Sequence, residues 1–240
     1  MLMMYKHKRN TFFCFSPPIM IATCIIETTL LIYTLVRYRL TPVARLVAAA
    51  LALLALFQLC EFNVCGSGGP SAAVWSRIGF AAITMLPPIG MHLIAMISKR
   101  IPRVVVNAGY VTGLAFALVF GAGAGVFQSH VCAGNYAIFQ LKPPIGGLYF
   151  AYYYGWLIVG ILWSIYLSLN AAQRVREALA FQAVGYLILL IPVGIVNDVN
   201  PQTISGIPSI MCGFAVVYAI MLVFGIVPRV LKPRSKAKAK

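Results

Sequence analysis

Three of the four acidic residues of this 240-residue chain lie in or beside long apolar stretches. Glu27 lies inside the first stretch, Glu61 near the end of the second and Asp198 at the end of the sixth. An ionisable group inside a bilayer is costly and usually marks a functional site. We expect these acids to form an outward-opening ligand pocket with Trp75 and Arg77, in which Arg77 pairs with one of them. The alternative interpretation is a network of ion pairs that holds helix ends together.

A second group of residues could change the shape of a helix. Pro87 and Pro88 lie in the middle of the third apolar stretch, and His92 follows about one turn later. Proline lacks a backbone N–H and kinks a helix or opens its hydrogen-bond ladder. We expect these three residues, together with Pro192 in the sixth stretch, to form a conformational switch. A hydrogen bond to a neighbouring helix is the expected role of His92, in preference to metal or haem binding.

No motif in the sequence indicates a catalytic or metal site. The chain has no GxSxG, no HExxH and no Gly-rich phosphate loop. It also has no CxxC and no cluster of Cys and His, which zinc and iron–sulfur sites require. None of the apolar stretches contains a lysine to which retinal could be attached. We therefore expect a protein that is not an enzyme and has no metal and no cofactor.

Seven apolar stretches must position these residues. They cover 19–36, 46–64, 74–97, 104–127, 148–169, 178–196 and 207–227. A helix that crosses a bilayer needs about 20 mostly apolar residues, and hydrocarbon accepts only helices or closed barrels. Because the chain is 61% hydrophobic and only 10% charged, the sequence predicts an all-α polytopic membrane protein with a seven-helix transmembrane bundle.

The positive charges predict the orientation of this bundle. Five of the 19 Lys and Arg residues fall on the side of the amino terminus, and the other 14 fall on the opposite side. Cytoplasmic loops carry the excess of Lys and Arg, so we expect the amino terminus outside and the carboxyl terminus in the cytoplasm. The net charge of +15 is then a topology signal, and we expect contact with the lipid bilayer and no binding of nucleic acid.

This topology divides the chain into three parts. A basic amino-terminal extension covers 1–18, the transmembrane domain covers 19–228, and a Lys-rich cytoplasmic tail covers 229–240. The extension places Lys6, Lys8 and Arg9 on the outer side, although the positive-inside rule, which the loops between the spans follow, favours the cytoplasmic side for Lys and Arg. Translation from Met20 instead of Met1 would remove that conflict, and the sequence leaves both starts open.

Two cysteines fall in connections on the expected outer side. Cys65 follows the second stretch and Cys132 lies between the fourth and fifth. An oxidising exterior allows such a pair to form a disulfide. The sequence alone does not show whether the two backbones approach each other.

Two stretches resemble the seven-helix amino-terminal sensor region of some bacterial histidine kinases. One is 73–97, AVWSRIGFAAITMLPPIGMHLIAMI, in which a Trp near the helix start precedes a Gly and then Pro and His. The other is 181–224, FQAVGYLILLIPVGIVNDVNPQTISGIPSIMCGFAVVYAIMLVF. The resemblance implies a bundle that detects a ligand or a membrane condition and relays it across the bilayer. In that family a cytoplasmic signalling domain follows the seventh helix, whereas here a short Lys-rich tail follows, so kinase activity is not carried over.

We therefore expect a receptor or sensor in the cell membrane, with the bacterial inner membrane as the expected location. A ligand in the outer half would favour one arrangement of the third and sixth helices, and a separate cytoplasmic signalling protein would read it out. The alternative is a transporter or channel for a small solute or ion, in which Glu27 and His92 relay protons or ions. Ligand, partner and oligomeric state stay open.

Overall fold

The computed structural model describes residues 17–66, 71–123, 125–133, 136–200 and 206–233. Within these residues, seven helical segments are long and apolar enough to cross a membrane. The prediction of an all-α, seven-helix, multi-pass membrane protein is confirmed, and its lipid-facing helices imply contact with the bilayer. The amino-terminal extension up to residue 16 and the last seven residues of the tail lie outside the described residues. Met1 is one of these residues, so the choice between a start at Met1 and a start at Met20 stays open.

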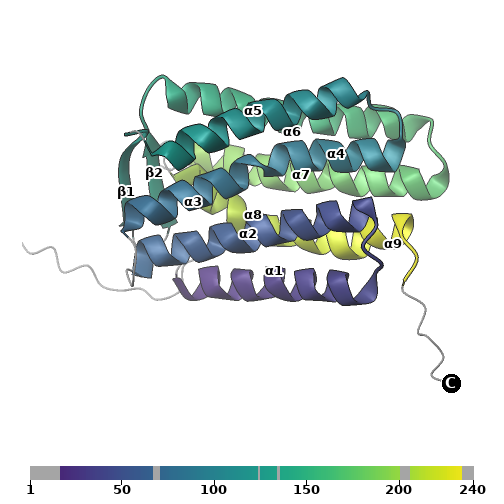
Figure 1. The fold of residues 1–240 in the computed structure, drawn as a ribbon, viewed down its shortest axis with the longest axis horizontal. Coiled ribbons are helices and arrows are strands. Elements are labelled where there is room, and N and C mark those ends of the chain that lie inside the picture. Colours follow the sequence, from purple (N-terminus) through teal and green to yellow (C-terminus); the bar gives the residue numbers. More distant parts are fainter. Residues whose placement is uncertain (1–16, 67–70, 124, 134–135, 201–205, 234–240) are drawn as a thin grey trace, which may run out of the picture.

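The elements follow one another along the chain and run back and forth between the two ends of the bundle (Figure 1). They are α1 (Pro17–Arg37), α2 (Pro42–Gly66), α3 (Ala72–Thr84), α4 (Leu86–Ser98), α5 (Arg103–Ala122), β1 (Phe127–Ala133), β2 (Tyr136–Leu141), α6 (Ile145–Leu169), α7 (Gln173–Val199), α8 (Ile207–Ile220), the π-helix η2 (Met221–Ile226) and α9 (Val227–Val230). The third membrane span consists of α3 and α4, and the seventh consists of α8, η2 and α9.

The bundle buries one side of each helix and leaves the other side to lipid. Leu51, Met91 and Leu222 are fully buried in the central core. Ile25 and Leu162, by contrast, are 59% and 59% exposed. Large exposed apolar side chains would be unfavourable in water, but in hydrocarbon they are the expected surface of a spanning helix.

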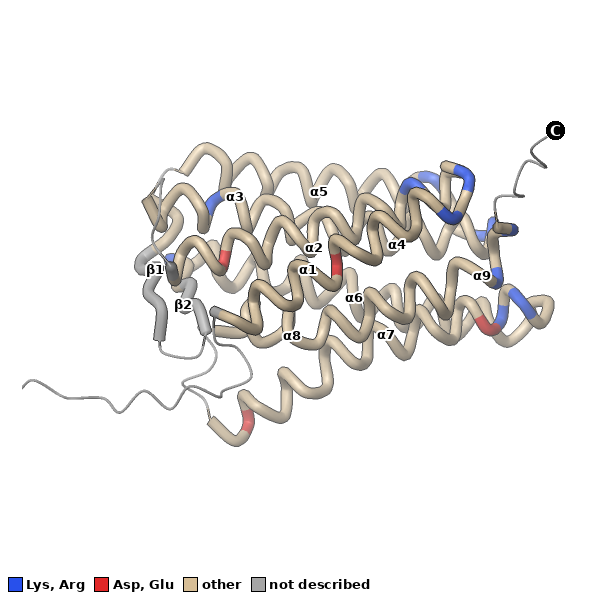
Figure 2. The backbone as a smooth tube through the Cα atoms, turned by 90° about the horizontal axis from the view of Figure 1, so that it is seen from below, with Lys and Arg blue, Asp and Glu red and all other residues tan. Residues whose placement is uncertain are grey.

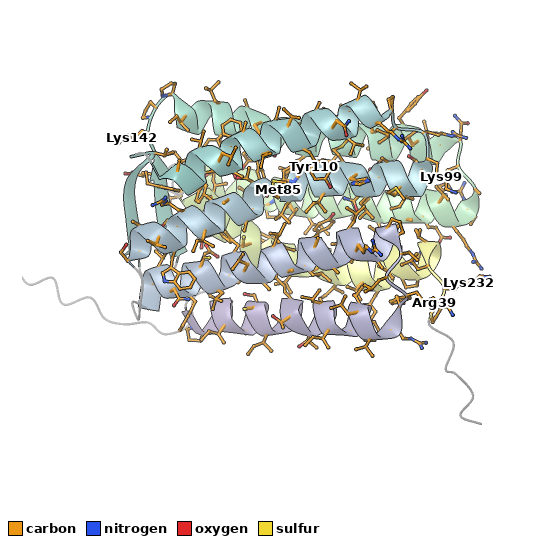
Figure 3. All side chains as sticks on the ribbon, viewed as in Figure 1. Arg39, Met85, Lys99, Tyr110, Lys142 and Lys232 are labelled. Carbon is orange, nitrogen blue, oxygen red and sulfur yellow. The ribbon has the colours of Figure 1, made fainter. Side chains whose placement is uncertain are left out.

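The two ends of the bundle differ in charge. Of the 12 Lys and Arg among the described residues, ten lie where α1, α4, α6 and α9 end and α2, α5 and α7 begin. We call this the basic end. The opposite end carries Arg77 and Lys142, and because β1 and β2 lie there we call it the hairpin end (Figure 2). Figure 3 shows Arg39, Lys99 and Lys232 at the basic end and Lys142 at the other.

The connection between the fourth and fifth spans contains two short strands. It forms an antiparallel hairpin of β1 and β2, with Phe127 opposite Leu141 and Ala133 opposite Tyr136. This hairpin contacts the ends of α2 and α3. Cys65, in the last turn of α2, is disulfide-bonded, while Cys24, Cys60 and Cys212 are free thiols. The side chain of Cys132 on β1 lies outside the described residues, so its pairing with Cys65 stays a prediction.

The third span is interrupted next to its two prolines, as the sequence predicts. Helix α3 ends at Thr84 and α4 begins at Leu86, with Met85 between them and Pro87 and Pro88 in the first turn of α4. The missing N–H of Pro88 leaves the Thr84 carbonyl without its helical donor. The hydroxyl of Tyr152 on α6 donates to that carbonyl at 2.7 Å. The break is thus stabilised by a neighbouring helix.

Proline has a smaller effect in the sixth span. Helix α7 runs from Gln173 to Val199 as one α-helix with Pro192 inside it. The two sites therefore differ: the first interrupts its helix, whereas the second leaves the helix continuous. The proposed switching role of these prolines stays a prediction.

Candidate functional site

A large apolar cavity lies inside the bundle between α2, the third span (α3 and α4), α6, α7 and α8. Its empty volume is about 800 Å³, including its opening to the surroundings. Aliphatic side chains such as Leu54 and Leu93 form much of its wall, and the polar groups come mainly from tyrosines. The tyrosines in its lining are Tyr149, Tyr153, Tyr154, Tyr186 and Tyr218.

The cavity borders the break between α3 and α4. Ile83 and Leu86, which flank the break, are both part of its lining. Tyr149 also lines it, and its hydroxyl is hydrogen-bonded to Oγ1 of Thr84 at 3.2 Å. Thr84 Oγ1 also bonds to the Phe80 carbonyl at 2.6 Å. Side chains next to the interruption of the third span are therefore part of the cavity wall.

Tyr186 of α7 forms the wall of the cavity opposite this break. A Cβ atom on Gly90 would lie 1.7 Å from its hydroxyl oxygen, and one on Gly160 would lie 2.6 Å from its ring. The absence of side chains at these two positions lets α4 and α6 close on the tyrosine ring. Beside it, Nε2 of Gln182 donates to the Tyr218 hydroxyl at 2.7 Å. The position of the ring is thus fixed by three helices.

A second, smaller cavity lies between α1, α2 and α8 near the hairpin end. Its empty volume is about 190 Å³. The polar side chains that line it are Thr23, Gln58, Glu61 and Ser209. Glu61 is 1% exposed, and the Ser209 hydroxyl hydrogen-bonds to its carboxyl group. Nε2 of Gln58 donates to the Cys212 carbonyl at 3.2 Å, which ties α2 to α8 beside the cavity.

Glu27 lies next to this smaller cavity. It is one turn along α1 from Thr23, its side chain is 0% exposed, and neither of its carboxyl oxygens has a hydrogen-bond partner. Its carboxyl group interacts electrostatically with that of Glu61. The structure therefore brings together two of the three acids that the sequence singles out, in the interior of the bundle.

The other residues of the predicted ligand pocket lie elsewhere. Arg77 donates to the Gly121 carbonyl of α5 and makes no ion pair with Glu27, Glu61 or Asp198, so the predicted pairing is wrong. The physical reason is that Arg77 lies on the face of α3 that packs against α5. Trp75 packs in an aromatic cluster at the hairpin end, and its buried Nε1 has no partner. The five predicted residues thus do not share one pocket, and their binding role stays a prediction.

Asp198 lies in the last turn of α7, and its side chain is exposed. It lines neither cavity. An exposed carboxylate at a helix end is stable in water without a specific partner. Its position therefore gives no sign of a ligand site at this residue.

His92 of α4 contacts the neighbouring helix α5. Its Nδ1 lies 3.0 Å from the hydroxyl of Tyr110 on α5, and the two rings are perpendicular. The expected hydrogen bond to a neighbouring helix is confirmed. Because α1 and α5 lie at opposite edges of the bundle (Figure 1), Glu27 and His92 are separated by other helices. A direct relay between them is not formed.

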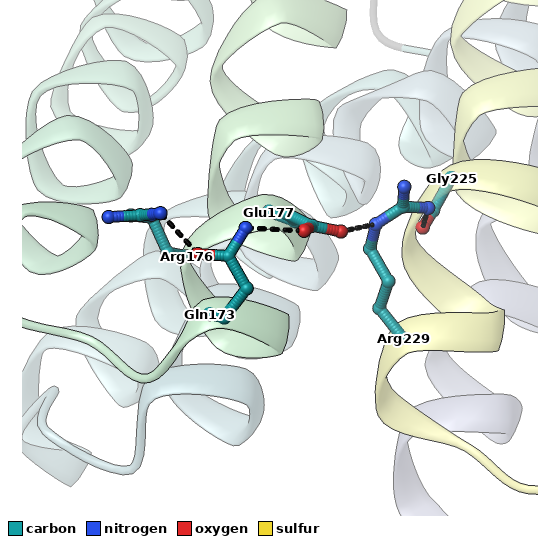
Figure 4. Close-up of polar contacts among 5 residues, drawn as sticks. All are labelled: Gln173, Arg176, Glu177, Gly225 and Arg229. Atoms are coloured by element: carbon teal, nitrogen blue, oxygen red, sulfur yellow. Dashed lines mark hydrogen bonds and ion pairs between the residues drawn. The ribbon is translucent and has the colours of Figure 1, made fainter.

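At the basic end, Glu177 joins α7 to the end of the seventh span. Oε2 of Glu177 lies 2.6 Å from Nε of Arg229, and Oε1 accepts from Gln173 at 2.7 Å (Figure 4). Arg229 also donates to the Gly225 carbonyl, and its guanidinium lies 4.4 Å from the centre of the Phe181 ring. This acid lies in the first turns of α7, within reach of α9, and its side chain stays 38% exposed.

Sequence reasoning found the two buried acids but missed the large cavity. A void depends on how side chains from five helices meet, and each of those helices reads as uniformly apolar. The sequence did contain a sign of the cavity, the tyrosines at 149 and 152–154, but such a run is also typical of an aromatic belt at a membrane surface.

No protein-family model and no curated protein matches the sequence.

Proposed function

We propose that the protein is a membrane receptor that binds a small, mainly apolar molecule in the large central cavity. The observation that carries this proposal is the position of the cavity beside the break between α3 and α4. Helical breaks with prolines are places where a span can adopt two arrangements. A ligand shifts such an equilibrium only if it contacts the two arrangements differently. Ile83, Leu86 and Tyr149 line the cavity next to the break, so the contacts of a ligand with these side chains would differ between the two arrangements.

The same cavity reaches the seventh span. Ala215 and Tyr218 of α8 line it, and α8 continues through the π-helix η2 into α9, where Arg229 meets Glu177. Short π-helical segments in α-helices often occur at functional sites. In the proposed mechanism, a ligand that moves α8 breaks or forms this exposed contact at the basic end.

The proposal includes an orientation and a partner. The concentration of Lys and Arg at the basic end supports a cytoplasmic location for it, with the amino terminus outside. A separate cytoplasmic signalling protein would read the arrangement of α4, α7 and α9 there. The resemblance of 73–97 and 181–224 to sensor regions of bacterial histidine kinases supports this role and the bacterial inner membrane as its location.

A transporter is the second candidate function. The observation that favours it is the buried pair of Glu27 and Glu61, because acids inside membrane bundles are common on ion and proton pathways. Flux of the bound compound or of ions into proteoliposomes distinguishes the two. The receptor proposal predicts no flux above that of protein-free vesicles.

The receptor proposal is tested by asking what the cavity holds. The protein is purified in lipid nanodiscs, and native mass spectrometry is used to detect a retained small molecule. Ala215→Phe places a ring in the cavity, because Ala215 is 3% exposed and part of its lining. We expect this variant to lose the bound mass while it still folds, as its helical circular dichroism would show.

Val217→Phe is the matched control, because Val217 lies two residues away on α8 and is 43% exposed on the lipid-facing side. It should retain the bound molecule. If neither the wild type nor the control holds a small molecule, or if Ala215→Phe holds it equally well, the cavity is not the ligand site.

A further inference from the structure

The small cavity between α1, α2 and α8 is built from oxygen-bearing side chains. Thr23, Glu61 and Ser209 contribute hydroxyl and carboxyl groups, and Gln58 contributes an amide. Thr23 is 9% exposed, Gln58 2% and Ser209 2%. Three different helices therefore contribute polar groups to one small cavity of an otherwise apolar bundle.

One carboxyl group in the lining, that of Glu61, and one beside the cavity, that of Glu27, have oxygen atoms without a hydrogen-bond partner among the described residues. Oε1 of Glu61 has no hydrogen-bond partner, and the same is true of both carboxyl oxygens of Glu27. Both side chains are essentially unexposed. A buried polar group without a partner costs free energy, and a buried charge without a counter-charge costs far more. The arrangement is stable only if a proton or a bound cation neutralises these groups.

The described residues supply no positive side chain for this purpose. The described lining of the cavity contains no Lys, Arg or His. The other titratable groups facing the acids are the thiols of Cys24 on α1, Cys60 on α2 and Cys212 on α8, none of which can carry positive charge. Arg77, the nearest candidate from the sequence, bonds to α5 instead.

We propose that this cavity binds a hard metal cation at Glu61, with Glu27 beside it as the second acid. Carboxylate, hydroxyl and amide oxygens are the ligands that such cations prefer. A divalent ion would balance two ionised carboxylates, and a monovalent ion would balance one while the other keeps its proton. The described residues contain no group of three or more His, Cys, Asp or Glu able to hold a metal, so Thr23, Gln58 or Ser209 must complete the coordination. This site is separate from the central cavity and does not depend on a ligand there.

The test compares cations at constant ionic strength. The protein is washed with a chelator, placed in nanodiscs of zwitterionic lipid, and melted in choline chloride by intrinsic fluorescence. Sodium, calcium and magnesium are then titrated separately against choline, which identifies the ion. A cation that binds only the folded state raises the melting temperature, and we expect a saturable rise of about 5 °C at a hundredfold excess over its Kd.

Glu27→Gln and Glu61→Gln should each abolish this rise, because an amide keeps the shape but not the charge. Glu177→Gln, the matched control at the exposed acid, should leave the rise unchanged. If the glutamine variants do not fold, Thr23→Val keeps both acids and should move the titration midpoint to about tenfold higher cation concentration. The proposal is overturned if no cation differs from choline. It is equally overturned if the rise persists in both glutamine variants, which would assign it to adventitious surface binding.

Discussion

The two cavities lie on opposite faces of α8, and they differ in size and chemistry. Met211, Ala215 and Tyr218 face the large cavity, whereas Ser209 and Gly213 face the small one. The large cavity is lined by aliphatic and aromatic side chains and suits an apolar molecule. The small cavity gathers acids and hydroxyls and suits an ion. One helix thus separates two environments that select different ligands.

Because both cavities share α2 and α8, occupation of one should affect the other. The clearest link is the hydrogen bond from Gln58, in the small cavity, to the carbonyl of Cys212, whose residue lines the large one. Two sites that bias the same two-state element are coupled, and the coupling is reciprocal. The comparison therefore predicts that a cation in the small cavity changes the affinity of the large one.

The largest effect is expected from Gly90→Ala in the wall of the large cavity. The new Cβ would lie 1.7 Å from the Tyr186 hydroxyl, and the ring cannot retreat because it also packs against Gly160. Overpacking of this kind costs about 3 kcal/mol in unfolding free energy. Melting in nanodiscs measures it.

Gly194→Ala is the matched control, because no atom lies within 4 Å of a Cβ at that position. It should be neutral or slightly stabilising, as alanine is a better helix former than glycine by up to about 1 kcal/mol. Equal melting temperatures for the two variants would mean that Tyr186 does not form a rigid wall.

The next largest effect is expected from Tyr152→Phe at the helix break. The change removes the hydroxyl that donates to the Thr84 carbonyl. An unsatisfied buried carbonyl costs about 2 kcal/mol. Tyr166→Phe on the same helix is the control, since Tyr166 is 68% exposed, and it should leave the melting temperature unchanged. A Tyr152→Phe variant as stable as this control would show that the break needs no support from α6.

A smaller effect is expected from Gln58→Leu, which removes the bond between the two cavities. The loss of the donor to the Cys212 carbonyl should cost about 1 kcal/mol. Asn63→Leu, one turn further along α2, removes a hydrogen bond within a single helix and should cost less. If the two variants lose the same stability, the bond does not tie α2 to α8.

The smallest effect is expected from Glu177→Gln at the basic end. This acid and Arg229 are 38% and 29% exposed, so water and salt replace the interaction. The melting temperature should not change measurably at physiological salt. A loss as large as that of Gly90→Ala would instead make this contact a structural element of the bundle.

The sequence predicted the helices far better than it predicted the site. Length and hydropathy determine a membrane span locally, so seven spans and the interruption at Pro87 and Pro88 could be recognised without a structure. The burial of Glu27 also followed from its place in an apolar stretch. In each case the decisive information lies within one helix.

What could not be predicted depends on how helices face each other. Arg77 and Glu61 are both near the hairpin end, but they lie on helix faces that point to different neighbours, α5 in one case and α8 in the other. Likewise, Glu177 and Arg229 are separated by 52 positions and meet only because α7 packs beside α9. A sequence pattern indicates which face of a helix is apolar, but not which other helix packs against that face.

The central claim is that the large cavity controls the arrangement of the basic end. Spin labels at Lys99→Cys on the end of α4 and Lys232→Cys after α9, both positions exposed and visible in Figure 3, allow pulsed electron spin resonance to measure the distance between these elements. The measurement compares protein loaded with the molecule that native mass spectrometry identifies and protein freed of it. A shift of population between two distances on loading is the result that the receptor mechanism predicts. Identical distance distributions in the loaded and empty protein would contradict it.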